Sequence, residues 1–334
     1  MNTANELLSF YLEWHGHATK ALVLGRSFSI PPGYSSVENI VVCGVGGSGV
    51  VGDYLEKISS IKSGPPIFVA KSFEVPNWVS RRTLVISISF SGNTHETISC
   101  TLNATRKGAR IITVSSGGKL LAYSKDKGIP HLIIPMAPAA RAAWPYLFFS
   151  TLGFLYENGI ILIDRKELFE AVEVLGSREK LLSYSFSITN TLYSLLEDKR
   201  NKIVLVAPYE FAPLITRARN EFAENTKLFV NAIILPDSGH NDIEALASLN
   251  DVFYLFLHTG SSTWSELINR IRNSLRINRS SEIILEGESF LSKIVWGTWL
   301  FGVTSLTLAE KLGVNPLDTK YIKFFRSIIE EIYI

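Results

Sequence analysis

Short apolar runs alternate with helix-like patterns along the first half of the chain. Five runs rich in Val and Ile predict buried strands at residues 39–45, 66–72, 82–90, 109–116 and 130–135. Between them, residues 47–59, 93–108 and 118–128 show the spacing and the end signals of helices. Strands that are apolar on both faces and separated by helices indicate a parallel sheet covered on both sides.

The same alternation restarts after a mostly helical stretch at residues 144–200. Strand patterns cover residues 201–208, 251–258 and 282–287, and helical patterns cover residues 209–227, 263–276 and the tail. We therefore predict an α/β protein with two domains, residues 1–160 and 161–334, each a mainly parallel sheet flanked by helices on both faces.

The composition is that of a globular protein without a strongly charged partner. Hydrophobic residues make up 46% and the formal net charge is +2, so neither nucleic acid nor a membrane surface is expected as the main partner. The charge-free run 294–309 is short for a membrane span and predicts a buried helix. The start resembles an amphipathic helix, not a signal peptide. These features predict a cytoplasmic protein in which Cys43 and Cys100 are buried thiols in a reducing compartment.

The stretch VVCGVGGSGVVGD, residues 41–53, places four glycines within the six positions 44–49, where a predicted strand meets a predicted helix. Glycines there let the backbone approach a ligand, and the N–H groups of the following helix attract anions. Gly44, Gly46 and Gly49 also satisfy the dinucleotide spacing, but the next strand ends near Lys71 instead of an acidic residue. A nucleotide loop, a phosphate loop and a structural turn all remain open from this stretch alone.

A second stretch, SFSGNTHET at residues 89–97, favours the phosphate loop. Ser89, Ser91, Asn93 and Thr94 stand at the end of a strand and the start of a helix. Hydroxyl and N–H groups at a helix N-terminus form a neutral cradle for a phosphomonoester. Because an N-cap needs only one hydroxyl, the cluster exceeds what capping requires.

This second stretch resembles the S-[YF]-S-G-N-T-x-E-T signature of sugar isomerase (SIS) domains, which bind phosphosugars. Over nearly its whole length the chain resembles the double-SIS enzymes of the phosphoglucose isomerase superfamily, the bifunctional phosphoglucose/phosphomannose isomerases in particular. The resemblance implies that Ser48, Ser89, Ser91 and Thr94 hold the sugar phosphate. It also implies that Gly47 places its backbone against the substrate.

An aldose–ketose isomerase needs a base that moves a proton between C1 and C2. The stretch RARNEFAENTK, residues 217–227, resembles the family's N-E-N-A-K pattern and aligns Glu224 with that base, with Ala223 and Thr226 as departures. On the same helix Glu221 follows Arg217 by four residues, and we expect the two to form a solvated ion pair.

The resemblance assigns two further roles to His240 and Arg141. His240 stands where the family has a ring-opening histidine, which the neighbouring subunit contributes, so a homodimer is implied. Arg141 lies in a stretch resembling the family's P-R-x-A-x-x-Y, with Ala140 in place of the usual proline. Its guanidinium is expected to stabilise the enediolate.

The tail VNPLDTKYIKFFR, residues 314–326, resembles a further segment of the superfamily. Thr319 falls where strict phosphoglucose isomerases carry glutamine and the bifunctional enzymes carry threonine, which implies mannose 6-phosphate as a second substrate. Arg326 falls at the family's ring-opening lysine. Because arginine does not readily give up a proton, either Arg326 acts electrostatically, or Lys323 or Lys320 takes the role.

Together these features predict a hexose 6-phosphate isomerase that works through a cis-enediol without metal or cofactor. Three alternatives stay open: a phosphosugar sensor without catalysis, an isomerase of another phosphosugar, and a Rossmann oxidoreductase that binds NAD(P). Glu224, His240 and Arg141 together argue against the sensor, because binding alone needs none of them.

Overall fold

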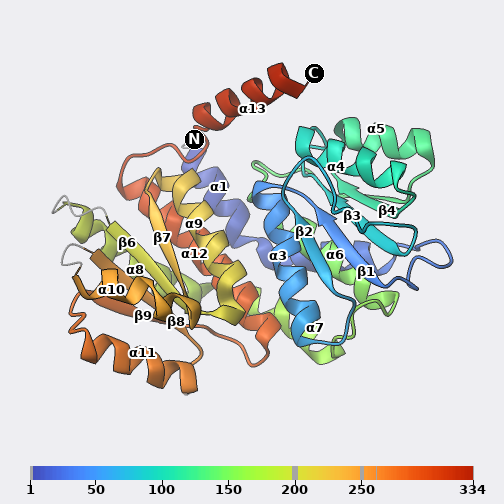
Figure 1. Ribbon diagram of the computed structural model, residues 1–334. Helices are drawn as coiled ribbons and strands as arrows, with labels where there is room; N and C mark the ends of the chain where they lie inside the picture. Colours follow the sequence, from blue (N-terminus) through green and yellow to red (C-terminus); the bar gives the residue numbers. More distant parts are fainter. Residues whose placement is uncertain (1–2, 198–201, 249–251, 261, 334) are drawn as a thin grey trace. The chain divides into compact units, whose positions relative to one another are not determined.

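The computed structural model describes residues 3–197, 202–248, 252–260 and 262–333 (Figure 1). It forms two compact units, which we name by their sheets. The five-stranded unit comprises Glu13–Arg165 and Thr319–Ile334, and the four-stranded unit comprises Met1–Leu12 and Lys166–Asp318. The domain boundary predicted after residue 160 remains a prediction.

All strands of the five-stranded sheet run parallel, in the order β2-β1-β3-β4-β5. Their bounds are Asn39–Cys43 (β1), Ile67–Ala70 (β2), Thr83–Ile88 (β3), Arg110–Ser115 (β4) and His131–Ile133 (β5). Each lies within a strand expected from the sequence. Cys43 pairs in register with Ser87, so β1 and β3 end side by side.

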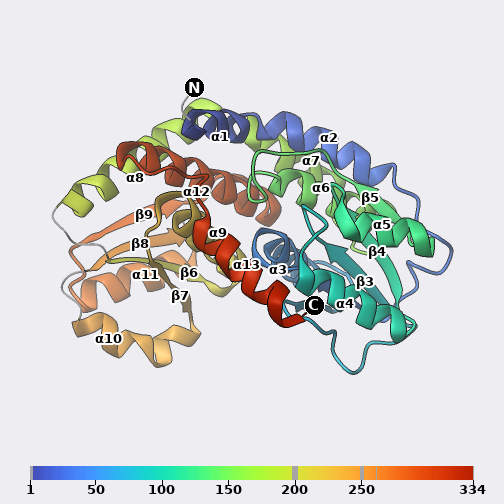
Figure 2. The same ribbon diagram turned by 90° about the horizontal axis from the view of Figure 1, so that it is seen from above.

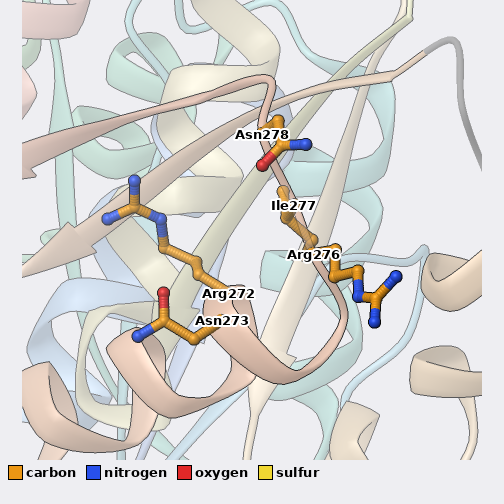
Figure 3. Close-up of a pocket in the computed structure, with 5 residues that line it drawn as sticks. All are labelled: Arg272, Asn273, Arg276, Ile277 and Asn278. Carbon is orange, nitrogen blue, oxygen red and sulfur yellow. The ribbon is translucent and has the colours of Figure 1, made fainter.

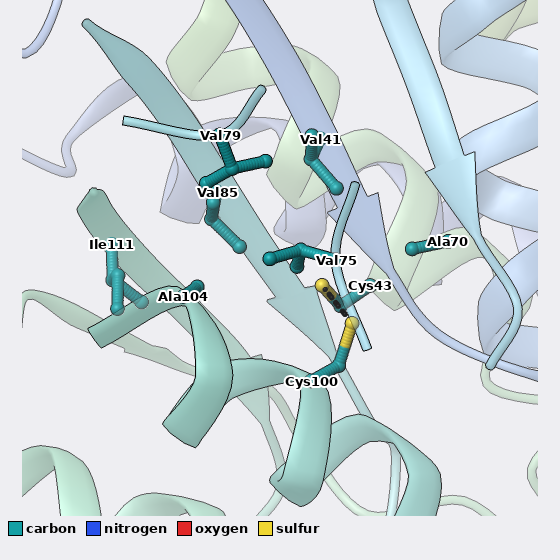
Figure 4. Packing of buried hydrophobic residues seen from close by; sticks show 9 residues of the cluster. All are labelled: Val41, Cys43, Ala70, Val75, Val79, Val85, Cys100, Ala104 and Ile111. Atoms are coloured by element: carbon teal, nitrogen blue, oxygen red, sulfur yellow. Dashed lines mark hydrogen bonds between the residues drawn. The ribbon is translucent and has the colours of Figure 1, made fainter. Parts of the chain in front are cut away.

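Helices cover both faces of this sheet, as expected for consecutive β-α-β units. They are α2 (Trp14–Arg26), α3 (Gly46–Ile61), α4 (His95–Arg106), α5 (Gly118–Lys127) and α6 (Trp144–Glu157). α13 (Lys320–Tyr333) belongs to the same unit and has no buried residue. Val41 and Cys43 of β1 share an apolar cluster with α4 (Figure 4). Val42, between them, lies 2.9 Å from where a Cβ on Gly52 of α3 would stand, so α3 packs on the opposite face.

The four-stranded sheet is also parallel, in the order β7-β6-β8-β9. Its strands are Lys202–Pro208 (β6), Val230–Leu235 (β7), Val252–His258 (β8) and Ser280–Ile284 (β9). β6 and β8 confirm two predictions, although residues 201 and 251 of those runs lie outside the described residues. β9 begins and ends earlier than expected, and the sequence analysis did not predict β7.

Helices again flank this sheet. They are α1 (Thr3–Leu12), α7 (Arg165–Glu173), α8 (Arg178–Glu197), α9 (Ala212–Thr226), α10 (Asp242–Ser248), α11 (Thr263–Ser274) and α12 (Phe290–Lys311). α12 is buried from Leu291 to Ala309 except at Lys293, which confirms the predicted buried helix. None of the described helices combines the length and the apolar character that crossing a membrane requires. The predicted class, parallel α/β sheets covered by helices, is confirmed.

Candidate functional site

The two stretches that suggested phosphate binding lie together at a break in the sheet order. β1 pairs with β2 on one side and with β3 on the other. The chain therefore passes from β1 to β2 at one edge of the sheet and then crosses back to form β3 on the other side of β1. Parallel α/β sheets bind ligands at such a switch point, outside the carboxyl ends of the strands. Residues 44–49 follow β1 and residues 89–94 follow β3, which places both at this point.

Ser48 joins the two loops. It lies in the first turn of α3 and is 8% exposed. Its hydroxyl oxygen accepts a hydrogen bond from the backbone N–H of Phe90 at 3.2 Å. Since the hydroxyl acts here as an acceptor, its own proton remains to be donated to a second partner. Gly47 precedes it, with its backbone at the N-terminus of α3.

Hydroxyl groups shape the second loop from within. Ser89 is fully buried, and its Oγ lies 2.9 Å from the Oγ1 of Thr94 and accepts the N–H of Gly92 at 3.1 Å. Thr94 stands at the N-cap of α4, but its side chain makes no capping hydrogen bond. Ser91 is exposed, and its Oγ accepts the N–H of Asn93 at 3.2 Å.

A third loop, residues 117–119, packs against the second loop, residues 89–94. Gly92 has a φ of 67°, and a Cβ there would overlap the carbonyl oxygen of Gly117. Gly118 has a φ of 72°, and a Cβ there would overlap the carbonyl oxygen of Ser91. The Asn93 side chain accepts the N–H of Lys119 at 3.0 Å. The two loops therefore hold each other through backbone contacts that only glycine permits.

This arrangement, which we call the cradle (residues 46–48 and 89–94), suits a small anion. Two helix N-termini, those of α3 and α4, begin within it, and such ends favour negative charge. At the end of β2, where a dinucleotide fold places an acidic residue, Lys71 binds Asp53 at 2.5 Å. Burial raises the pKa of Asp53 above its ordinary value, and Lys71 opposes that rise.

The C-terminal helix α13 lies against the cradle side of the same unit (Figure 2). Glu330 approaches the imidazole of His95, the first residue of α4, to 3.4 Å. Tyr333 stacks on Phe73, with ring centroids 4.0 Å apart. Arg326 is exposed one turn before Glu330. The helix that bears Arg326 therefore contacts the helix whose N-terminus forms the cradle.

Thr319 and Arg141 belong to this unit as well. Thr319 is half-buried just before α13, and its carbonyl oxygen accepts the N–H of Lys323 at 3.1 Å. Arg141 is 4% exposed, between β5 and α6. β5 is parallel to the other strands, so Arg141 follows a strand end on the cradle side of the sheet.

Glu224 lies in the four-stranded unit, half-buried in the last turn of α9. The ammonium group of Lys227, just after that helix, donates to the carbonyl oxygens of Glu224 and of Asp318, the latter at 2.6 Å. A cation at a helix C-terminus stabilises the exposed carbonyls there. Lys227 thus fixes the end of α9 beside the residue that precedes Thr319, a role the sequence analysis missed.

The prediction that Arg217 and Glu221 form a solvent-exposed ion pair is wrong about the exposure. The two side chains do form an ion pair, but each residue is only 1% exposed. The hydroxyl of Tyr11 donates to the Glu221 carboxylate at 2.8 Å, and the side-chain amide of Asn225 donates to it at 2.8 Å. Asn225 also donates to Ser305 of α12 at 2.8 Å. Helix spacing identified the pair, but α1 and α12 bury it.

Glu224 and His240 stand at opposite ends of one strand. α9 ends at Thr226, just before β7, and His240 is exposed in the 3-10 turn that follows β7. β7 has 6 residues, which span roughly 17–20 Å. Within one chain, these two side chains therefore do not share a substrate-sized site.

Comparison with known proteins shows which enzymes the chain resembles. Residues 193–329 match the model of the bacterial phospho-glucose isomerase C-terminal SIS domain. A bifunctional phosphoglucose/phosphomannose isomerase from Aeropyrum pernix is 28% identical over 340 residues, 96% of this chain and 97% of that protein. The chain is therefore similar along nearly its whole length to bifunctional phosphoglucose/phosphomannose isomerases.

Two further proteins are similar to this chain. A D-glucosamine-6-phosphate 4-epimerase from Sulfolobus acidocaldarius is 26% identical over 297 residues, 88% of this chain and 90% of that protein. A hypothetical protein from Thermus thermophilus has a solved structure with a TM-score of 0.75 at 15% identity, covering 99% of this chain and 94% of that one. The last likeness shows that the two proteins share a fold.

A separate pocket lies in the four-stranded unit, at the C-terminal end of α11 (Figure 3). Arg272, Asn273, Arg276, Ile277 and Asn278 line it. None of the predicted site residues does. Arg272 is held by the carboxylate of Glu282, which offsets its charge.

Proposed function

We propose that this chain interconverts glucose 6-phosphate and mannose 6-phosphate with fructose 6-phosphate. The observation that carries the proposal is the cradle at the β1/β3 switch point, in a chain similar along 96% of its length to a bifunctional phosphoglucose/phosphomannose isomerase. The predicted cytoplasmic location remains part of the proposal.

The cradle would hold the phosphate of the substrate. In this proposal Ser48, Ser89, Ser91 and Thr94 supply hydroxyl groups, while the N-termini of α3 and α4 supply N–H groups and a favourable potential. The Ser48 oxygen accepts a hydrogen bond from Phe90, so its hydroxyl proton would be donated to the phosphate. Gly47, which carries no side chain, leaves room for the sugar to lie against the backbone.

Two charged groups would act on the reacting carbons. Glu224 would remove the proton at C2 of the aldose and return it at C1, so that a cis-enediol forms in between. Arg141, which keeps its charge at any working pH, would stabilise the developing enediolate. The side chain of Thr319, smaller than glutamine, would leave space for either C2 epimer.

Ring opening needs a proton on the ring oxygen before that step. His240 would supply it, and the positive charge of Arg326 would assist, since arginine itself does not release a proton readily. Lys323 and Lys320 lie on the same helix and remain alternatives to Arg326.

The placement of His240 supports a homodimer in which the partner subunit supplies this residue. Glu224 and His240 lie at opposite ends of β7, so one chain alone does not offer both to one substrate. In a two-fold symmetric dimer, each site would combine Glu224 of one subunit with His240 of the other.

Co-expression of two inactive variants tests the dimer. Glu224→Gln and His240→Ala chains, each of low activity alone, are expected to give about a quarter of wild-type turnover together, because half of the dimers are mixed and each mixed dimer holds one intact site. A mixture no more active than the separate variants would show that both residues act within one chain.

The main test is a coupled assay for fructose 6-phosphate on the purified full-length chain in EDTA. Turnover of both glucose 6-phosphate and mannose 6-phosphate is expected, at a rate that EDTA does not change. Binding of fructose 6-phosphate without turnover would instead identify a sensor, and saturable NAD(P) binding would identify an oxidoreductase.

A second candidate reaction is epimerisation of glucosamine 6-phosphate. Similarity to the Sulfolobus acidocaldarius epimerase over 88% of this chain favours it. Chromatography of glucosamine 6-phosphate after incubation with the protein distinguishes the two reactions. A new epimer, together with unchanged glucose 6-phosphate in the coupled assay, would replace the first proposal with this one.

A further inference from the structure

The chain has two cysteines, and they meet directly behind the cradle. Cys43 is the last residue of β1, next to Gly44, and Cys100 lies in the second turn of α4. Their sulfur atoms are 2.8 Å apart, and both residues are 0% exposed (Figure 4). These residues are 57 positions apart in the sequence, so the fold alone brings them together.

The surroundings of the two sulfur atoms are mostly apolar, with the side chain of Ser87 as a further hydrogen-bond partner of Cys43. The side chains of Cys43 and Cys100 lie in the apolar cluster that also contains Val41, Val75 and Val85. A disulfide bond is about 2.05 Å long. The sulfur atoms therefore need to approach by less than about 1 Å to reach that length.

We propose that Cys43 and Cys100, which the sequence analysis expected as buried thiols of a reducing compartment, form a disulfide under oxidising conditions that joins β1 to α4 behind the cradle, with a small disulfide such as oxidised glutathione as the oxidant. No other cysteine in the sequence competes for either partner. The bond would enclose residues 44–99, which carry every residue of the cradle. This inference does not depend on the proposed activity.

The exchange balances in two steps. The thiolate of one cysteine attacks oxidised glutathione, forming a mixed disulfide and releasing one glutathione thiolate. The thiolate of the other cysteine then attacks the protein sulfur of that mixed disulfide, and the second glutathione thiolate leaves. The two protein thiols lose two electrons and two protons, and one molecule of oxidised glutathione takes them up to become two molecules of reduced glutathione.

Burial decides when this exchange takes place. Burial and the neighbouring Cys100 raise the pKa of the Cys43 thiol well above its ordinary value, so little thiolate exists in the folded protein. Exchange is therefore expected while the chain folds and the sulfur atoms still meet solvent. Once the cluster closes, the same burial protects the bond from reductants.

The test is refolding of the full chain from guanidinium chloride, once in a buffer of oxidised and reduced glutathione and once in dithiothreitol. In the glutathione buffer, thiols titrated in denaturant are expected to fall from two per chain to none, and a non-reduced digest is expected to link the two cysteine peptides. Closing a loop of this length is expected to raise the melting temperature by roughly 5–15 °C over the reduced protein.

Single variants provide the control. Cys43→Ala and Cys100→Ala remove the partner while leaving the rest of the apolar cluster, so the melting temperature of each is expected to be the same in both buffers. Two thiols per wild-type chain after refolding in the glutathione buffer would overturn the proposal. So would glutathione left attached to either cysteine, or covalent dimers on a non-reducing gel.

Discussion

Replacing Glu224 with glutamine is expected to lower turnover of glucose 6-phosphate by roughly 10²–10⁴-fold, the usual contribution of a general base. Glutamine has nearly the same size as glutamate and makes similar hydrogen bonds, but its amide does not accept the proton from C2. KM is expected to change little, because the proposed phosphate ligands belong to the cradle. The measurement is the coupled assay with wild-type and variant proteins at matched concentration.

A matched control lies on α11 of the same unit. Glu266 is a helix glutamate paired with Arg270 in the exposed i,i+4 arrangement. Glu266→Gln is expected to leave turnover within a factor of two, because it removes a carboxylate far from any proposed role. A folded Glu224→Gln protein that keeps more than a tenth of wild-type turnover would remove Glu224 from the role of base.

Replacing Arg217 with methionine is expected to lower the free energy of unfolding by about 3–5 kcal/mol. Methionine fills much of the same volume, so the loss comes from charge. The Glu221 carboxylate would remain buried beside Tyr11 and Asn225 without its cation, and an uncompensated buried charge is costly. Urea unfolding followed by fluorescence measures the change.

The exposed pair Glu266–Arg270 again supplies the comparison, because it has the same chemistry and helix spacing with side chains 63% and 76% exposed. Arg270→Met is expected to cost less than about 0.5 kcal/mol, since surface ion pairs contribute little. A loss under about 1 kcal/mol for Arg217→Met would mean that the buried network does not stabilise the fold. A double variant, Arg217→Met with Glu221→Leu, is expected to recover part of the loss.

The sequence predicted the strands best where both faces are buried. β3 and β8 are buried at every position, and apolar residues dominate each of them. β7 stands at the edge of its sheet, and its side chains alternate between buried and more exposed positions. With Asn231 inside it, the run is short and less apolar. The pattern therefore lacks the signal that revealed the central strands.

The residues of the candidate site could be predicted where they lie close together in the sequence. Ser89, Ser91 and Thr94 lie within one loop, so their grouping was visible before the fold was known. The burial of Glu221 was not, because Tyr11, which covers it, is 210 positions away. The same holds for Cys43 and Cys100: residue spacing shows neither which strand end a helix covers nor which side chains then touch.

Gly92 has a consequence for how this site evolves. Its left-handed backbone and its contact with the carbonyl oxygen of Gly117 exclude every side chain larger than hydrogen. Substitution at this position is therefore excluded by the backbone itself, whereas Ser91 and Asn93 beside it are constrained only through their side-chain hydrogen bonds. Any protein that keeps this loop conformation must therefore keep glycine at position 92, whatever ligand the loop holds.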